Sequence, residues 1–185
     1  MEGSFCKIVA AKDTFSGSRP VAIKILHNKP NHALFGQMEY HTIRKLNEAD
    51  PSGRHVVHAY AAFFEGNHYC IVLEYGRFNL AQYTGAKSLV FADIRKVTSQ
   101  LLSALKLLRS ESIIHADIKP ENILVKLDEA GSFDCVKLID FGNAMNTDQA
   151  PQYYNSYEVQ TLCYRAPEVL LGSPFLTPID MWSVG

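Results

Sequence analysis

Apolar residues recur along this chain with two different periods, which separate the expected helices from the expected strands. Steps of three or four residues predict one amphipathic helix through Ile94, Val97, Leu101, Leu105 and Leu108. A second helix is expected from about Leu34 to Asn47, because Met38, Ile43 and Leu46 give this stretch an apolar face. We interpret both apolar faces as core.

Shorter apolar runs, bounded by turn-forming residues, predict strands. The runs are Val21–Leu26, about Val56–Phe64, about Tyr69–Tyr75, Ile123–Val125 and Val136–Ile139. A Glu65-Gly66-Asn67 turn joins the second and third runs, and a polar excursion over 128–134 predicts a lengthened hairpin turn between the last two.

Composition narrows the class of protein. The chain has 185 residues, 47% hydrophobic and 20% charged, which suits one domain or a small two-lobed one. A net charge of −1 argues against binding to nucleic acid or to a membrane through bulk electrostatics, and no apolar run reaches membrane-spanning length. Four cysteines without a paired spacing suggest neither zinc nor disulfides, so reduced thiols and a cytoplasmic or nuclear location are expected.

A short charged stretch carries the candidate chemistry. Asp117 is followed two residues later by Lys119 and five residues later by Asn122, and Asp140 ends the next strand. An acid that accepts a hydroxyl proton, a lysine that faces a moving phosphoryl group and two oxygen ligands for Mg²⁺ would together serve phosphoryl transfer. Taken singly, Asp-Phe-Gly would be a strand-end turn and His115 a core histidine, so the joint pattern carries the prediction.

The pattern His-Ala-Asp-Ile-Lys-Pro-Glu-Asn over 115–122, followed by Asp-Phe-Gly over 140–142, resembles that of the eukaryotic protein kinases. The resemblance implies an α+β two-lobed kinase fold, with a β-rich N-lobe over residues 1–76 and a mainly helical C-lobe over 77–185. It also implies ATP and Mg²⁺ as cofactors and a protein as substrate. The Lys119–Asn122 run resembles the pattern of kinases directed to serine and threonine.

The resemblance extends to an ATP site in the first part of the chain. The opening residues look like a Gly-rich phosphate loop entered part-way, Val21–Lys24 matches the strand whose lysine holds the phosphates, and a helical glutamate would pair with that lysine. Leu73–Gly76 resembles the gatekeeper and hinge, whose backbone binds adenine. The residues expected at the ATP site are Gly3, Ile8, Lys24, Glu39, Leu73, Glu74 and Tyr75.

The last third of the chain resembles a kinase activation segment and the helix start that comes after it. Asn143–Gln160 is polar and contains three tyrosines, Tyr153, Tyr154 and Tyr157. Thr161 is expected to bridge Asp117 and Lys119. Thr177 is expected to cap a helix that has a proline at its first position and Asp180 in its first turn.

Within the kinases, the chain looks most like the homeodomain-interacting and dual-specificity tyrosine-regulated group. Ala116 supports this, because most kinases carry arginine there. The tyrosine that this group autophosphorylates aligns with Glu158, which has Tyr157 beside it, and Leu162 stands where relatives have arginine. The resemblance therefore does not identify how this chain would be activated. The chain is expected to start inside the Gly-rich loop and to lack the first strand and the later C-lobe helices, so that alone it would be poorly stable and nearly inactive.

Two other functions are compatible with parts of this pattern. A kinase-fold scaffold could bind nucleotide or protein partners without turnover, and a nucleotide-binding titration would separate it from an enzyme. A small-molecule phosphotransferase shares the His-x-Asp logic. The Ala166-Pro167-Glu168 block and the tyrosine-rich segment, which shape a groove for a protein substrate, argue against the second.

Overall fold

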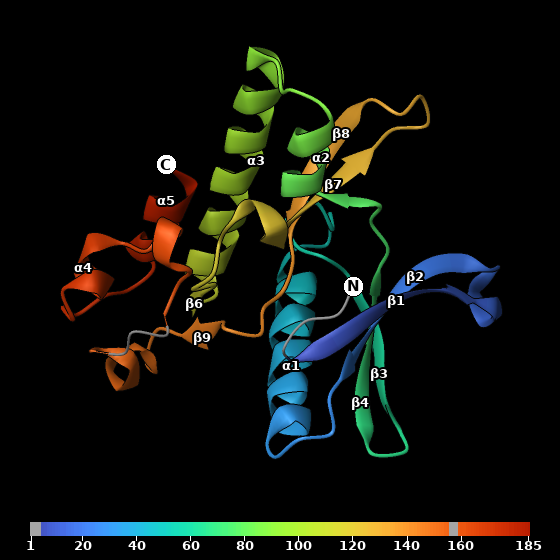
Figure 1. Ribbon diagram of the computed structural model, residues 1–185, viewed down its shortest axis with the longest axis horizontal. Helices are drawn as coiled ribbons and strands as arrows, with labels where there is room; N and C mark the ends of the chain where they lie inside the picture. Colours follow the sequence, from blue (N-terminus) through green and yellow to red (C-terminus); the bar gives the residue numbers. More distant parts are fainter. Residues whose placement is uncertain (1–4, 156–158) are drawn as a thin grey trace.

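A four-stranded antiparallel sheet forms one part of the molecule, and a mostly helical part carries the remainder (Figure 1). The computed structural model describes residues 5–155 and 159–185. The sheet contains β1 (Cys6–Asp13), β2 (Arg19–Leu26), β3 (Ala59–Glu65) and β4 (His68–Glu74), in the order β1-β2-β4-β3. A short turn, η1 (Thr14–Ser16), and Gly17 with φ of +68° connect the first two strands.

Helix α1 (His32–Ala49) packs along this sheet, and its buried face includes Ile43 and Leu46. Gly36 is needed at the contact, because a Cβ there would lie 2.8 Å from the Tyr69 ring. The prediction that Met38 belongs to this face is wrong, since its side chain is 48% exposed. Met38 lies five residues before Ile43, on another side of the helix, and Glu39, four residues before Ile43, takes the inward position.

The strand expected from Val56 begins only at Ala59, because the preceding backbone pairs with a different part of the molecule. The N–H of Val57 donates to the carbonyl of Leu138, and the N–H of Leu138 donates to the carbonyl of His55, both at 2.9 Å. Asp50 shapes this loop by accepting bonds from the backbone and ring of His55. Burial alone would raise the pKa of Asp50, but bonds from Ser52 and His55 outweigh it and lower the pKa to about 2.

The helical part is built on α3 (Phe91–Ser110), and four of its five predicted core residues are buried: Val97, Leu101, Leu105 and Leu108. The prediction fails for Ile94, whose side chain is 48% exposed. Phe91 and Leu102 are exposed as well and line one groove with Ile94, so this side of α3 is only partly covered. A preceding helix, α2 (Leu80–Ala86), was not predicted. It starts with a capping box in which Asn79 and Gln82 satisfy each other's backbone N–H groups.

The predicted hairpin with a long polar turn is present as β7 (Ile123–Leu127) and β8 (Phe133–Leu138). Strand β5 (Phe78–Asn79) extends it, while β6 (Ile113–Ile114) pairs with β9 (Met145–Asn146). The remaining elements are η2 (Pro120–Asn122), η3 (Ala150–Tyr153), η4 (Leu162–Tyr164), α4 (Pro167–Leu170) and α5 (Pro178–Val184).

Helix α5 begins where the sequence predicts, but Thr177 does not cap it through its side chain. Its φ of −50° and ψ of −26° are helical, whereas a capping residue needs an extended backbone to turn its hydroxyl toward the first N–H groups. In the part of the chain that the structure describes, no helix has both the length and the apolar character needed to cross a bilayer.

Candidate active site

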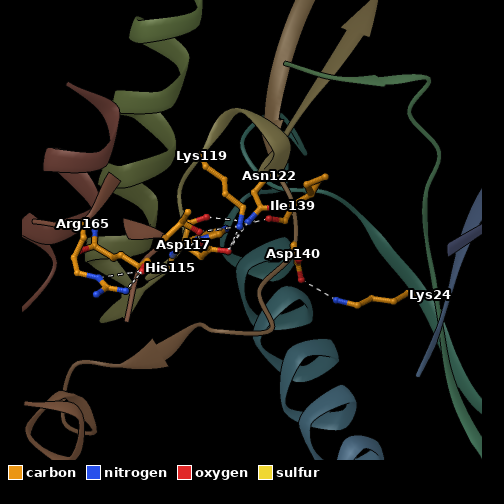
Figure 2. Close-up of polar contacts among 10 residues, drawn as sticks. Lys24, His115, Asp117, Lys119, Asn122, Ile139, Asp140 and Arg165 are labelled. Atoms are coloured by element: carbon orange, nitrogen blue, oxygen red, sulfur yellow. Dashed lines mark hydrogen bonds and ion pairs between the residues drawn. The ribbon is translucent and has the colours of Figure 1, made fainter. Parts of the chain in front are cut away.

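The expected catalytic side chains meet between η2 and the segment before η4 (Figure 2). The Thr161 hydroxyl donates to Oδ1 of Asp117 at 2.6 Å, and Nζ of Lys119 lies 2.9 Å from both the Thr161 oxygen and Oδ2 of Asp117. Nδ2 of Asn122 donates to Oδ2 of Asp117 at 3.0 Å and to its backbone carbonyl at 2.9 Å. Asp117 is 7% exposed, so these contacts fix its orientation.

His115 is a buried residue that connects the loop carrying Asp117 to the strand end at Ile139. Its Nδ1 accepts the backbone N–H of Asp117 at 3.3 Å, which assigns the proton to Nε2, 3.0 Å from the carbonyl of Ile139. The ring lies 4.8 Å from the ring of Phe141, which is buried in the main core. His115 is itself fully buried, as expected for a packing residue with no acid–base role.

Asp180 holds the same loop, a role the sequence did not indicate. Its carboxylate accepts the backbone N–H of His115 at 2.7 Å and that of Ala116 at 2.9 Å. The residue is 2% exposed, and burial raises its pKa while the bonds from the two backbone N–H groups act to lower it. An acid in the first turn of a helix is ordinarily explained by the helix dipole. The carboxylate of Asp180 instead binds backbone N–H groups 64 and 65 residues earlier in the chain.

Three residues without the freedom of glycine adopt positive φ around the site. They are Ala116 at +62°, Asp140 at +61° and Gln160 at +62°. Such backbone costs on the order of 1 kcal/mol or more at each position and persists only where neighbours fix it. Here the N–H of Gln160 donates to the carbonyl of Ala116 at 3.0 Å, which links two of the three.

The side chain of Gln160 joins the segment before η4 to α5. Its amide donates to the carbonyl of Ile179 and to the hydroxyl of Ser183, both at 2.8 Å, and its oxygen accepts the N–H of Ala166 at 2.9 Å. Arg165 donates twice to the Gln160 carbonyl. Every polar group of Gln160 is therefore paired, and this role could not be read from its position in the motif.

Lys24 forms a second charged cluster with two carboxylates. Its Nζ lies 2.7 Å from Oε1 of Glu39 and 2.8 Å from Oδ1 of Asp140. Burial acts to lower the pKa of Lys24, but the two carboxylates outweigh it and raise the pKa, so the ammonium stays charged. For Asp140, burial would raise the pKa, but Lys24 outweighs it and the pKa lies below its usual value. The pairing partner expected for Lys24 is thus in place, together with a second one.

Asn122 and Asp140 offer hard oxygen atoms that would suit Mg²⁺. The amide nitrogen of Asn122 donates to Asp117, which leaves its oxygen as a ligand, and Oδ1 of Asp140 accepts from Lys24. Mg²⁺ characteristically takes one or two such protein ligands and completes its shell with water and phosphate. No cluster of three or more His, Cys, Asp or Glu residues capable of holding a metal occurs within 5–155 and 159–185.

The residues expected at the hinge lie between the sheet and the helical part of the molecule. Leu73 packs against both the main core and the small core of the sheet. Glu74 directs its carboxylate to Lys126 and Lys137, two residues that the sequence did not single out. Gly76 is required where it stands, because a Cβ would overlap the side chain of Leu124 on β7.

Of the other residues that the sequence singled out, some lie in the described part of the chain and others do not. Ile8 lies opposite Lys24 in the pairing of β1 with β2, while Gly3 is outside the described residues. Tyr157 and Glu158 are also outside them. Tyr154 packs edge-on against Phe175 and its hydroxyl donates to the Phe175 carbonyl at 3.3 Å, which anchors the segment after β9.

Lys24 and Glu39 should be strongly coupled in function. We expect Lys24→Met and Glu39→Gln each to lower kcat/KM, and the double variant to be little worse than the more damaging single one, because each change removes the same ion pair. A double-mutant cycle on kcat/KM for ATP measures this. Additive losses would instead show that Glu39 does not act through Lys24.

A family model, curated sequences and a solved structure that match this chain are all protein kinases or kinase domains. The protein kinase domain model matches residues 2–185. Homeodomain-interacting protein kinase 2 from Mesocricetus auratus and from Mus musculus is 40% identical over 168 residues, and kinase 1 of that name from Mus musculus is 39% identical. Each alignment covers 89% of this chain, which spans only 14% of the length of those relatives. A solved crystal structure of a kinase domain superposes with a TM-score of 0.84 at 25% identity, over 99% of this chain and 59% of that one.

Proposed function

The chain belongs to the protein kinase family, and from that premise we propose that it transfers the γ-phosphoryl group of ATP to serine or threonine hydroxyls of a protein. The observation that carries this proposal is the arrangement around Asp117, whose two carboxylate oxygens are held by Thr161, Lys119 and Asn122. Phosphoryl transfer needs little covalent chemistry from the protein, so positioned charges of this kind are its main contribution.

Asp117 would orient the substrate hydroxyl and accept its proton. Its contact with Thr161 fixes one oxygen, and its contacts with Lys119 and Asn122 fix the other. Lys119 carries its charge beside the same carboxylate, where it would stabilise negative charge on the transferring group. Thr161 thereby acts as a bridge that holds the acid and the lysine together.

Lys24 and Glu39 would position the nucleotide from the sheet side, and Asn122 with Asp140 would hold Mg²⁺. When bound, ATP and Mg²⁺ supply the phosphoryl group and neutralise its charge. Lys24 is already oriented by two carboxylates, at 2.7 and 2.8 Å. We place the hinge at Leu73–Tyr75, with one lobe over residues 1–76 and the other over residues 77–185.

The choice of serine or threonine rests on the residues after Asp117. The Lys119-Pro120-Glu121-Asn122 run has the form found in kinases directed to these hydroxyls, and Thr161 lies within hydrogen-bonding distance of Lys119. The same assay also tests autophosphorylation on tyrosine, for which Tyr153 and Tyr154 are candidate acceptors.

The proposal is tested by incubating the purified protein with Mg²⁺, γ-labelled ATP and a generic basic protein substrate. We expect label on phosphoserine and phosphothreonine after acid hydrolysis, and a loss of at least about 100-fold in the Lys24→Met control. Label on phosphotyrosine alone would overturn the residue specificity. Nucleotide binding without any transfer, under conditions where the protein is folded, would favour a scaffold instead.

A further inference from the structure

One carboxylate at the hinge is shared by two lysines of the β7–β8 hairpin. Oε1 of Glu74 lies 2.8 Å from Nζ of Lys126, and Oε2 lies 2.6 Å from Nζ of Lys137. The side chains of Glu74 and Lys137 are each 12% exposed, and that of Lys126 is 30% exposed. This cluster of three residues, called here the hinge clasp, is separate from the charged groups around Asp117 and Lys24.

The three residues come from parts of the chain that are distant in sequence. Glu74 ends β4, whereas Lys126 lies on β7 and Lys137 on β8. Lys137 pairs with Leu124, two residues before Lys126, so both lysines project from the same face of the hairpin. The hinge clasp therefore spans the junction between the sheet and the helical part.

Further bonds hold the hinge backbone at the same place. Lys126 also donates to the carbonyl of Tyr75 at 3.1 Å, and the backbone N–H of His58 donates to Glu74 at 3.3 Å. Gly76 lies so close to Leu124 that no side chain would fit between them. Two successive hinge residues are thus bonded to Lys126, and the next packs on the strand that carries this lysine.

The same hairpin carries the two candidate Mg²⁺ ligands at its base. Asn122 directly precedes β7, and Asp140 comes after β8 with one intervening residue. A rigid hairpin that is bonded to the hinge therefore fixes the distance between the place where adenine would bind and the place where the phosphates would meet metal. Misplacement by about 1 Å can cost on the order of 100-fold in rate, so this distance matters for transfer.

The carboxylate of Glu74 is charged at neutral pH. Burial alone would raise the pKa of Glu74, but the hydrogen bonds and charges of the two lysines outweigh it and leave the pKa below its usual value. Buried ion pairs contribute weakly to stability, because desolvation offsets their attraction, but they fix geometry well. A role in geometry is therefore more consistent with this cluster than a role in overall stability.

We propose that Glu74, held by Lys126 and Lys137, is a positioning residue that sets the hinge against the hairpin bearing Asn122 and Asp140. The inference rests on the proposed kinase function. It predicts that loss of the clasp weakens the productive alignment of the nucleotide phosphates and leaves recognition of adenine at the hinge intact.

The test compares Glu74→Gln, Lys137→Met and the double variant with the unmodified protein. We expect kcat/KM for ATP to fall between about 10- and 100-fold in each single variant, because both variants lose the ion pair between Glu74 and Lys137. The double variant should be no worse than Glu74→Gln, since Lys137 acts in the clasp only through Glu74. The Kd for adenosine, which lacks phosphates, should stay within about twofold. Lys137→Arg should restore most of the activity, since a guanidinium can also bond the carboxylate.

Glu48→Gln provides the matched control. It breaks the exposed ion pair between Glu48 and Arg44 on α1, whose N···O distance is 3.5 Å, and should leave all constants unchanged. Equal loss of adenosine and ATP affinity in Glu74→Gln would indicate a merely structural role and overturn the inference. An unchanged kcat/KM would also overturn it, while leaving the kinase function intact.

A readout independent of catalysis separates the two proposals. Should the unmodified protein transfer no phosphate, the kinase function fails, but the clasp is still tested by hydrogen exchange of the backbone amides of residues 74–79. We expect exchange there to speed up roughly tenfold in Glu74→Gln, because the hinge would open more often. Unchanged exchange would show that the clasp does not hold the hinge.

Discussion

Replacing Asp117 by asparagine is expected to lower kcat for phosphoryl transfer by about 10²–10⁴-fold, the usual contribution of a positioned general base. Asparagine keeps the volume of the side chain and can still accept from Thr161, but it cannot take up a hydroxyl proton. The change leaves the Lys24–Glu39 pair untouched, so the Kd for ATP should stay within about threefold. Steady-state kinetics together with calorimetric titration of ATP measure both quantities.

Asp134→Asn is the matched control for this variant, because Asp134 is an exposed residue of β8 outside the cluster around Asp117. It should retain the activity of the unmodified protein. Near-normal turnover of Asp117→Asn would refute the proposed role of Asp117. Equal losses of ATP affinity and turnover would mean that the substitution disturbs the whole site.

The parts of the fold that the sequence predicts best are those with a strong local period. Helix α3 is twenty residues long, so its apolar steps repeat often enough to be recognised, and the turn between β7 and β8 is marked by a run of polar residues. Helix α2 has only seven residues and too few turns to show a period. Its capping pair, Asn79 and Gln82, was the available signal.

In the candidate site too, the sequence predicts contacts between residues that are close in the chain and misses contacts between distant ones. Asp117, Lys119 and Asn122 are close in sequence, and their spacing in the motif places them on one loop. The contacts of Glu74 with Lys137 and of Asp180 with His115 span 63 and 65 residues. No pattern within a short window can indicate them, because they depend on how the two parts of the molecule pack.

Ala116 illustrates how a single motif position can have a structural consequence. It is buried in a second apolar core with Ile114, Met145, Ala150, Val159, Ala166, Val169, Phe175 and Ile179. This core joins the loop that carries Asp117 to the segments that contain Ala150 and Val159. Most kinases would have a charged arginine at position 116. Here apolar packing of Ala116 and the contacts of Gln160 hold these segments to the loop instead.

Replacing Asp180 by asparagine is expected to lower the free energy of unfolding by about 3 kcal/mol. The two oxygens of Asp180 each accept one buried backbone N–H, from His115 and Ala116. An asparagine amide has one oxygen, so in either orientation its NH₂ group faces one of these N–H donors, and that donor stays unpaired. Urea unfolding measures the loss as a lower midpoint concentration, and the m-value of the variant should equal that of the unmodified protein.

Asp148→Asn is the appropriate comparison, because Asp148 is exposed and should change stability by less than about 0.5 kcal/mol. The two bonds to Asp180 also support the positive φ of Ala116, immediately before Asp117. Asp180→Asn should therefore reduce kcat as well as stability, even at a temperature where the variant is fully folded. A variant as stable as Asp148→Asn would mean that the loop keeps its shape without this carboxylate, and that the strain at Ala116 is relieved by other contacts.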